Sequence, residues 1–171
     1  MDQICPVQIS NIISGSTVPK LYMLIGVPAS GKSTWVKNQE WALGLTIVNT
    51  DAFVEDYARA QGKTYSEVFT DYMPIAIDLM VEQVEFAREH GYTVIWDQTS
   101  TTIKSRARKF HMLPDYEHIA VVFPTPNPEE LARRLATRPG KTIPPEVIER
   151  MIADWQEPDL SEGFREIWRV R

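Results

Sequence analysis

Residues 26–33 read GVPASGKS and match the phosphate-binding pattern G-x-x-x-x-G-K-[ST] at every fixed position. The apolar run before them, residues 21–25, is typical of a buried parallel strand, and residues 33–37 behind them can open a helix. A strand, a glycine-containing loop and a helix start together wrap backbone N–H groups around a phosphate. The stretch therefore predicts a P-loop that binds a nucleoside triphosphate, the alternative being a chance match in a turn.

Side chains of this loop have separate expected tasks. Lys32 should reach the β- and γ-phosphates, and Ser33 should hold Mg²⁺. Further contacts to the nucleotide are expected from Gly26, Pro28, Ala29, Ser30, Gly31 and Thr34. ATP and Mg²⁺ are the expected ligands, but the loop does not identify the group that receives the phosphate.

The composition limits which class of protein this chain can be. The chain has 171 residues, 43% hydrophobic and 24% charged, which suits one domain with a sizeable core. A net charge of −5 is unfavourable for a protein that coats long nucleic acid. If nucleic acid is the partner, we expect the protein to bind an end of it, or a single nucleotide, in a local pocket. Cys5 is the only cysteine, which excludes an intramolecular disulfide and thiol-cluster metal sites. Without a membrane-length apolar run or a basic N-terminus, we expect no membrane partner and a cytoplasmic location.

Apolar runs alternate with helical patterns along the rest of the chain. Further strands are expected at residues 45–49, 92–96, 117–123 and 164–170, and helices at residues 52–61, 65–90, 103–112 and 128–137. Pro74 should break or kink helix 65–90, which would give a helix pair. This alternation predicts an α/β protein with a three-layer P-loop NTPase fold: a mainly parallel sheet flanked by helices, with a small helical lid. Residues 1–19 should form an N-terminal extension and residues 20–171 the P-loop domain.

Two carboxylates follow predicted strands. Asp51 comes just after strand 45–49 and Asp97 directly after strand 92–96, and open α/β sheets place their active sites at such strand ends. Asp97 should help Ser33 to hold Mg²⁺, while Asp51 should accept the proton of an attacking hydroxyl group. The alternative for both carboxylates is that they cap the helices that follow them.

Cations gather on two later segments. Those of helix 103–112 are Lys104, Arg106, Arg108 and Lys109. They either contact an anion beside the phosphate site or form a solvated basic face. Residues 138–142 form a basic loop, and cations on such a segment can close over the phosphates as a lid. Arg134 and Arg138 are expected to contact the nucleotide, and Arg138 to neutralise the transferred phosphate during phosphoryl transfer to an alcohol.

Four blocks in this order resemble the kinase domain of phage-type polynucleotide kinases. They are GVPASGKSTW (residues 26–35), VNTD (residues 48–51), IWDQT (residues 95–99) and RPGKTIP (residues 138–144). The resemblance, over roughly residues 20–155, implies that Lys32, Asp51 and Arg138 are catalytic and that Gln98 and Thr99 contact the acceptor. It implies an ATP-dependent kinase acting on a nucleic-acid hydroxyl. That hydroxyl is the 5′-hydroxyl of a polynucleotide or, as in related phage enzymes, a hydroxymethyl group on a DNA base.

The chain departs from this family's pattern at two positions. The family has an arginine three residues after its general base, where it binds the acceptor phosphate, and this chain has Val54 there. The asparagine of the family's D-x-N segment is replaced by Thr99. We expect Arg106, or else Arg108, to supply the missing cation to the substrate. Two other functions remain open: a small-molecule or sugar-nucleotide kinase of zeta-toxin-like type, and a non-catalytic nucleotide-binding module.

Overall fold

The computed structural model of the chain describes residues 18–39, 45–138 and 140–171. Most of the expected N-terminal extension and Pro139 of the basic loop lie outside the described residues. The strands are β1 (Lys20–Ile25), β2 (Thr46–Val48), β3 (Val94–Trp96), β4 (Glu117–Val122) and β5 (Glu166–Arg169). The helices are α2 (Lys32–Lys37), α3 (Thr50–Ala60), α4 (Tyr65–Glu89), α5 (Ile103–Met112), α6 (Pro128–Ala136), α7 (Pro145–Ala153) and the short 3₁₀ helix η2 (Leu160–Glu162).

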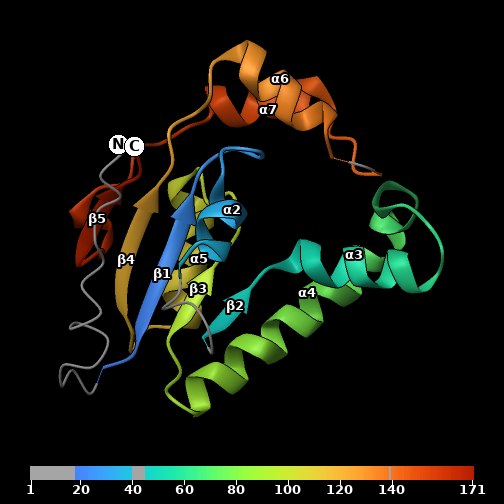
Figure 1. The fold of residues 1–171 in the computed structure, drawn as a ribbon. Helices are drawn as coiled ribbons and strands as arrows, with labels where there is room; N and C mark the ends of the chain where they lie inside the picture. Colours follow the sequence, from blue (N-terminus) through green and yellow to red (C-terminus); the bar gives the residue numbers. More distant parts are fainter. Residues whose placement is uncertain (1–17, 40–44, 139) are drawn as a thin grey trace.

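The five strands form one parallel sheet in the order β2-β3-β1-β4-β5 (Figure 1). β1 and β4 lie near its centre, and every residue of each after the first is buried, as expected for strands covered on both faces. Since β1 lies between β3 and β4, the P-loop that follows it is at the middle of the sheet's carboxyl edge. The predicted α/β P-loop fold is confirmed.

The two faces of the sheet carry separate cores, because successive residues of a strand point to opposite sides. Leu21 and Met23 of β1 pack in the core that includes Met80 and Val84 of α4. Tyr22 packs on the other face, in the core that includes Val36 of α2. The sheet is therefore the middle of three layers.

Helix α4 runs unbroken from Tyr65 to Glu89, so the prediction that Pro74 divides this segment is wrong. Pro74 lies on an exposed side of the helix, where water can reach the carbonyl that loses its N–H partner. The helix begins with a capping box formed by Thr64 and Glu67. Its first half packs along α3, and Val68 and Ala76 share a small core with Val54. These contacts hold α3 and α4 as one unit beside the sheet.

Helices α6 and α7 form the lid above the P-loop, together with the described residues between them, 137–138 and 140–144 (Figure 1). Leu131 of α6 and Ile148 of α7 pack on Val27 of the P-loop, which is fully buried. The lid is thus joined to the phosphate loop by an apolar contact. Within the part of the chain that the structure describes, no helix is both long and apolar enough to cross a membrane.

Candidate active site

The P-loop joins the end of β1 to the start of α2, as its sequence predicts. A Cβ atom at Gly26 would lie 2.5 Å from Ser30 Oγ and 3.0 Å from the Phe123 Cβ atom, so only glycine fits this turn. Gly31 has a φ of 104°, in the left-handed region that glycine adopts without strain. These two glycines let the backbone turn tightly enough to present its N–H groups to an anion.

The side chain of Lys32 folds back onto the P-loop. Its Nζ donates hydrogen bonds to the carbonyl oxygens of Gly26 (2.9 Å) and Val27 (2.8 Å). Burial is the largest cause that lowers the pKa of Lys32 to about 8; the charge of Asp97 opposes this shift and the charge of Arg138 adds to it. An anionic phosphate beside this ammonium would favour its protonated form. The lysine is therefore well placed to bind a phosphate.

Ser33 and Asp97 form a pair of oxygen donors. Ser33 Oγ donates a hydrogen bond to Asp97 Oδ2 over 2.7 Å. Asn49 Nδ2 donates to the same carboxylate oxygen over 3.3 Å, while Asn49 itself caps α3. A hydroxyl and a carboxylate side by side fit Mg²⁺, which prefers oxygen ligands and keeps several of its waters. Because Asn49 caps α3 and Thr102 caps α5, neither Asp51 nor Asp97 is a helix cap.

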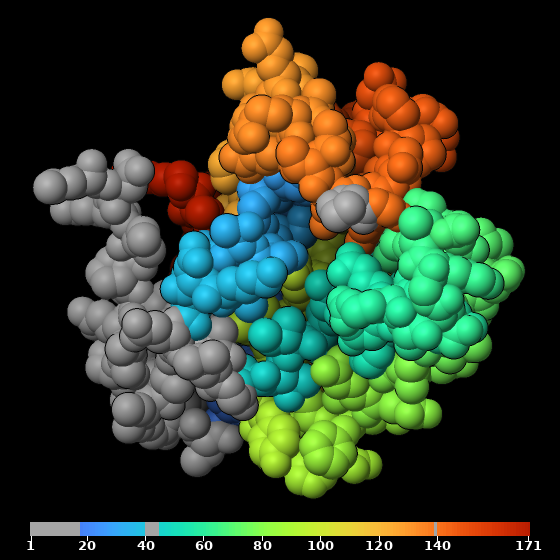
Figure 2. All heavy atoms as spheres, turned by 45° about the vertical axis from the view of Figure 1, so that its right-hand side comes forward, coloured from blue at the N-terminus to red at the C-terminus, as the bar shows by residue number. Residues whose placement is uncertain are grey.

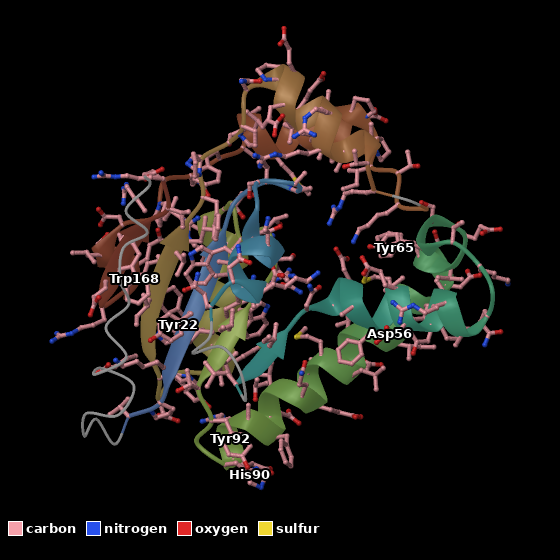
Figure 3. The ribbon with its side chains drawn as sticks, viewed as in Figure 1. Tyr22, Asp56, Tyr65, His90, Tyr92 and Trp168 are labelled. Atoms are coloured by element: carbon pink, nitrogen blue, oxygen red, sulfur yellow. The ribbon has the colours of Figure 1, made fainter. Side chains whose placement is uncertain are left out.

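Asp51 lies in the first turn of α3 and is held from two sides. Tyr65, at the start of α4, donates its hydroxyl to Asp51 Oδ1 over 2.7 Å. Lys141 of the lid donates to Asp51 Oδ2 over 2.6 Å and to Glu55 Oε1 over 3.1 Å, and its Nζ lies 4.1 Å from the centre of the Tyr65 ring. Figure 3 shows Tyr65 between α3 and the lid. Burial and the hydrogen bond to Asp51 raise the pKa of Tyr65, so the phenol stays a donor at neutral pH.

One large cleft opens between the P-loop, α3 and the lid (Figure 2). All the site residues predicted from the sequence line this cleft except Gly26 and Arg106. Arg138 lines it from the lid, and Arg134 Nη1 donates to the carbonyl oxygen of Ala29 over 3.2 Å. Gln98 Nε2 donates to Thr50 Oγ1 over 2.6 Å, which ties the end of β3 to the start of α3. The structure therefore brings together the phosphate loop, both carboxylates and the lid arginines.

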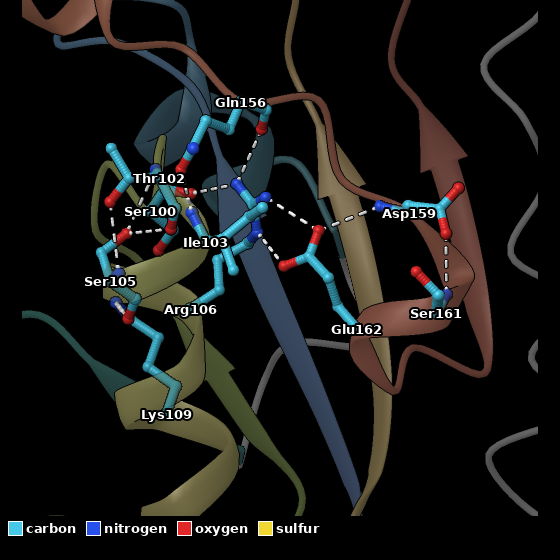
Figure 4. A network of polar contacts seen from close by, with 10 residues as sticks. All are labelled: Ser100, Thr102, Ile103, Ser105, Arg106, Lys109, Gln156, Asp159, Ser161 and Glu162. Carbon is cyan, nitrogen blue, oxygen red and sulfur yellow. Dashed lines mark hydrogen bonds and ion pairs between the residues drawn. The ribbon is translucent and has the colours of Figure 1, made fainter.

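Arg106 is a structural residue, contrary to the expectation that it contacts substrate. Its side chain is fully buried, and its Nε and Nη2 pair with the two carboxylate oxygens of Glu162 over 2.7 and 2.8 Å (Figure 4). Its Nη1 donates to the carbonyl oxygens of Ser100 and Gln156. All three nitrogens of the guanidinium group thus donate to oxygens of the protein itself. Val54 is also fully buried, so its position cannot contact an acceptor either.

The sequence did not single out Tyr65 or Glu55, and it identified Lys141 only as part of a basic lid loop. Glu55 has a sequence signal, because it follows Asp51 by four residues and so shares its helix face. Tyr65 has none, since its contact with Asp51 depends on how α3 and α4 pack. Lys141 lies 90 residues from Asp51 in the sequence, and only the folded lid brings them together.

Comparison with known proteins identifies the family and the fold of the chain. A family model described as an AAA domain matches residues 21–158. Among solved structures, a candidate kinase from Chloroflexus aurantiacus J-10-fl is 20% identical, with a TM-score of 0.65 over 91% of this chain and 86% of that one. A chain of the Pnkp1/Rnl/Hen1 RNA repair complex is 24% identical, with a TM-score of 0.59 over 84% of this chain and 46% of that one.

Shikimate kinase from Acinetobacter baumannii is 16% identical, with a TM-score of 0.53 over 91% of this chain and 85% of that one. At these identities the solved structures agree on the fold and leave the acceptor open. The family model covers most of the chain, from the first core strand to beyond the lid. Together with the five-stranded parallel sheet and the P-loop at its carboxyl edge, this match shows that the chain belongs to the AAA domain family and has a P-loop kinase fold.

Proposed function

We propose that this protein is an ATP-dependent kinase that transfers the γ-phosphate to a hydroxyl group of a nucleic acid. The observation that carries the proposal is a carboxylate, Asp51, which Tyr65 and Lys141 hold in the same cleft as Lys32. A carboxylate oxygen that accepts one hydrogen bond retains a further lone pair. This arrangement supports the proposal that Asp51 is the general base for an alcohol.

In the proposed reaction the acceptor oxygen bonds to the γ-phosphorus while the bond from that phosphorus to the bridging oxygen breaks. ADP leaves with the electron pair of the broken bond, and Asp51 takes the proton of the hydroxyl group. Lys32 and Arg138 supply positive charge to the phosphate oxygens. When Mg²⁺ is bound, for which Ser33 and Asp97 offer oxygen ligands, it adds to this charge neutralisation.

A nucleic-acid acceptor is supported by sequence and by likeness of fold. The four sequence blocks follow the order found in polynucleotide kinases, with Asp51 at the end of the second block. The fold resembles a chain of an RNA repair complex. With a net charge of −5, the protein would hold a nucleic-acid end or one nucleotide rather than a long strand. The proposed acceptor group is a 5′-hydroxyl or a hydroxymethyl group on a base.

A small-molecule kinase is the second candidate, and one observation favours it. The lid reaches across the cleft through Lys141, which bonds to Asp51 and Glu55 on α3. A cleft bridged in this way suits an acceptor small enough to be enclosed. The fold also resembles that of a shikimate kinase and of a chain from the PezAT toxin–antitoxin system of Streptococcus pneumoniae.

The test is transfer of a radiolabelled γ-phosphate to a panel of acceptors. The panel contains oligonucleotides with a 5′-hydroxyl, DNA with hydroxymethylated bases, nucleosides, shikimate and simple sugars, with Lys32→Ala as the negative control. Labelling of an oligonucleotide or modified DNA with the highest kcat/KM supports the proposal. Labelling confined to small molecules assigns the second function, and tight ATP binding without transfer to any acceptor would refute both in favour of a nucleotide-binding module.

A further inference from the structure

The four cations of α5 have different surroundings. Arg106 is paired with Glu162 inside the protein, and Lys104 is exposed and does not line the cleft. Arg108 is exposed and lines the cleft. Lys109 lines the cleft as well, yet only 5% of its surface is exposed to solvent. In Figure 4, Arg106 extends toward η2 whereas Lys109 lies on another side of the helix.

Lys109 is a buried cation without a carboxylate partner among the described residues. Its Nζ donates to the carbonyl oxygen of Ser105 over 3.2 Å and lies 5.4 Å from the centre of the Trp96 ring. Burial is the largest cause that lowers the pKa of Lys109 to about 8, and the charges of Arg106 and Arg108 lower it further. No described anion offsets this repulsion, so an anion arriving from the cleft would do so.

The surroundings of Lys109 in the cleft are mostly apolar. Trp96, Met80 and Met112 line the cleft with it, and they come from β3, α4 and α5. Trp96 is 1% exposed, and its indole N–H has no hydrogen-bond partner within the described part of the chain. A buried donor of this kind is costly unless something accepts from it. Around Lys109 the cleft therefore has an apolar wall, and the cation has no anionic partner among the described residues.

We propose that Lys109, with Trp96, Met80 and Met112, forms a subsite for an anionic group, a phosphate or a carboxylate, carried by the acceptor. Trp96 directly precedes Asp97 at the carboxyl end of β3, so the subsite adjoins the residues of the phosphate site. The identification of the bound anion as part of the acceptor rests on the proposed kinase function. The binding of an anion does not depend on that function.

A purely structural role for Lys109 makes a different prediction. In a structural role, the methylene groups of Lys109 would pack on Trp96 and its Nζ would bond to the carbonyl oxygen of Ser105. Such a role needs a long side chain at this position but no charged ligand. In that case a methionine at this position would keep the packing and change nothing about anion binding. The two roles are separated by comparing ligands that differ only in their anionic group.

The experiment measures binding by calorimetry with the P-loop filled by saturating ADP and Mg²⁺. The probes are two matched pairs: thymidine 3′-monophosphate against thymidine, and shikimate against its methyl ester. We expect the wild-type protein to bind the anionic member of at least one pair about tenfold or more tightly than the neutral one. The pair that shows this preference identifies the source of the anion as a nucleotide or a small acid.

Lys109→Met should reduce that preference to less than about twofold, whereas Lys109→Arg should retain it and Lys104→Met, on the same helix outside the cleft, should leave it unchanged. If Lys109→Met does not fold, Lys109→Gln takes its place. Equal binding of both members of both pairs by the wild type would overturn the proposal, as would a preference that survives Lys109→Met or is lost equally in Lys104→Met.

The same proteins distinguish failure of the subsite from failure of the kinase function. Loss of the anion preference in Lys109→Met with no phosphate transfer by the wild type would refute the kinase function and keep the anion subsite. Phosphate transfer by the wild type with no anion preference would keep the kinase function and refute the subsite.

Discussion

Replacement of Asp51 by asparagine is the sharpest test of the proposed chemistry. Asparagine keeps the shape of the side chain but cannot take a proton. Loss of a positioned general base typically lowers a rate by roughly 10²–10⁴-fold, or about 3–5 kcal/mol in activation free energy. ATP binding should remain nearly normal, because Asp51 bonds to Tyr65 and Lys141 and makes no hydrogen bond with Lys32 or Ser33.

The structure also sets the expected cost in stability. The carboxylate accepts hydrogen bonds from Tyr65 at Oδ1 (2.7 Å) and from Lys141 at Oδ2 (2.6 Å). An asparagine in the same position has an oxygen at only one of these two places, so one of the two donors would face an NH₂ group. Hydrogen bonds to charged groups contribute about 1.5–3 kcal/mol, and the 44% exposure of the Asp51 side chain reduces this to about 1 kcal/mol. The loss in transfer rate should therefore far exceed the loss in unfolding free energy.

The assay compares single-turnover transfer, ATP affinity and denaturant unfolding for Asp51→Asn and Asp97→Asn over a series of Mg²⁺ concentrations. Asp97→Asn should raise the Mg²⁺ requirement, because its carboxylate lies beside Ser33. Asp56→Asn is the matched control, since Asp56 is an exposed carboxylate of α3 that pairs with Arg59 instead (Figure 3). Rescue of Asp51→Asn by excess Mg²⁺, without rescue of Asp97→Asn, would mean that the two roles are reversed. Normal transfer by both variants would refute the mechanism.

Four further predictions follow from the same geometry. Lys32→Ala should reduce transfer by at least about a hundredfold, because it removes a preorganised charge at the phosphates, and circular dichroism should show a normal fold. Arg138→Ala should lower kcat more than it raises the KM for ATP, as measured by steady-state kinetics, if its charge acts on the transition state. Arg106→Met should cost about 3–5 kcal/mol of unfolding free energy in denaturant titrations, because it leaves the Glu162 carboxylate buried without its partner. Between about pH 8 and pH 10 the unfolding free energy of the wild type should rise relative to that of Lys109→Met, because the folded protein releases the Lys109 proton near pH 8 whereas the unfolded chain keeps it to higher pH.

Each of these has a result that would contradict it. Near-full activity of folded Lys32→Ala would locate the site elsewhere, and a change confined to KM in Arg138→Ala would assign that arginine to ground-state binding. A loss below about 1 kcal/mol in Arg106→Met would mean that the Glu162 carboxylate finds other partners or water. A constant difference in unfolding free energy across the pH range would mean that Lys109 keeps an ordinary pKa in the folded protein.

Local sequence was sufficient for the features that a few neighbouring residues control. The P-loop could be predicted because its glycines, lysine and serine are contiguous and its strand and helix flank it directly. The parallel sheet followed from buried apolar runs that alternate with helical segments. The location of Asp97 at the carboxyl edge of the sheet could be predicted because it directly follows β3, and any residue that follows a strand of a parallel sheet lies at this edge.

Contacts between distant segments were decided only by the tertiary structure. Arg106 was expected to contact the substrate because its partner, Glu162, is 56 residues away in the sequence, and the burial of both depends on how η2 packs beside α5. Pro74 looked like a helix break because local rules weigh the missing N–H and cannot include the packing of α4 against α3 and the sheet. Tyr65 and Lys141 meet at Asp51 because α4 and the lid converge there. The sequence by itself determined the phosphate-binding loop and the class of fold, whereas the surroundings of the proposed base and of Lys109 depended on packing between elements, which no local pattern encodes.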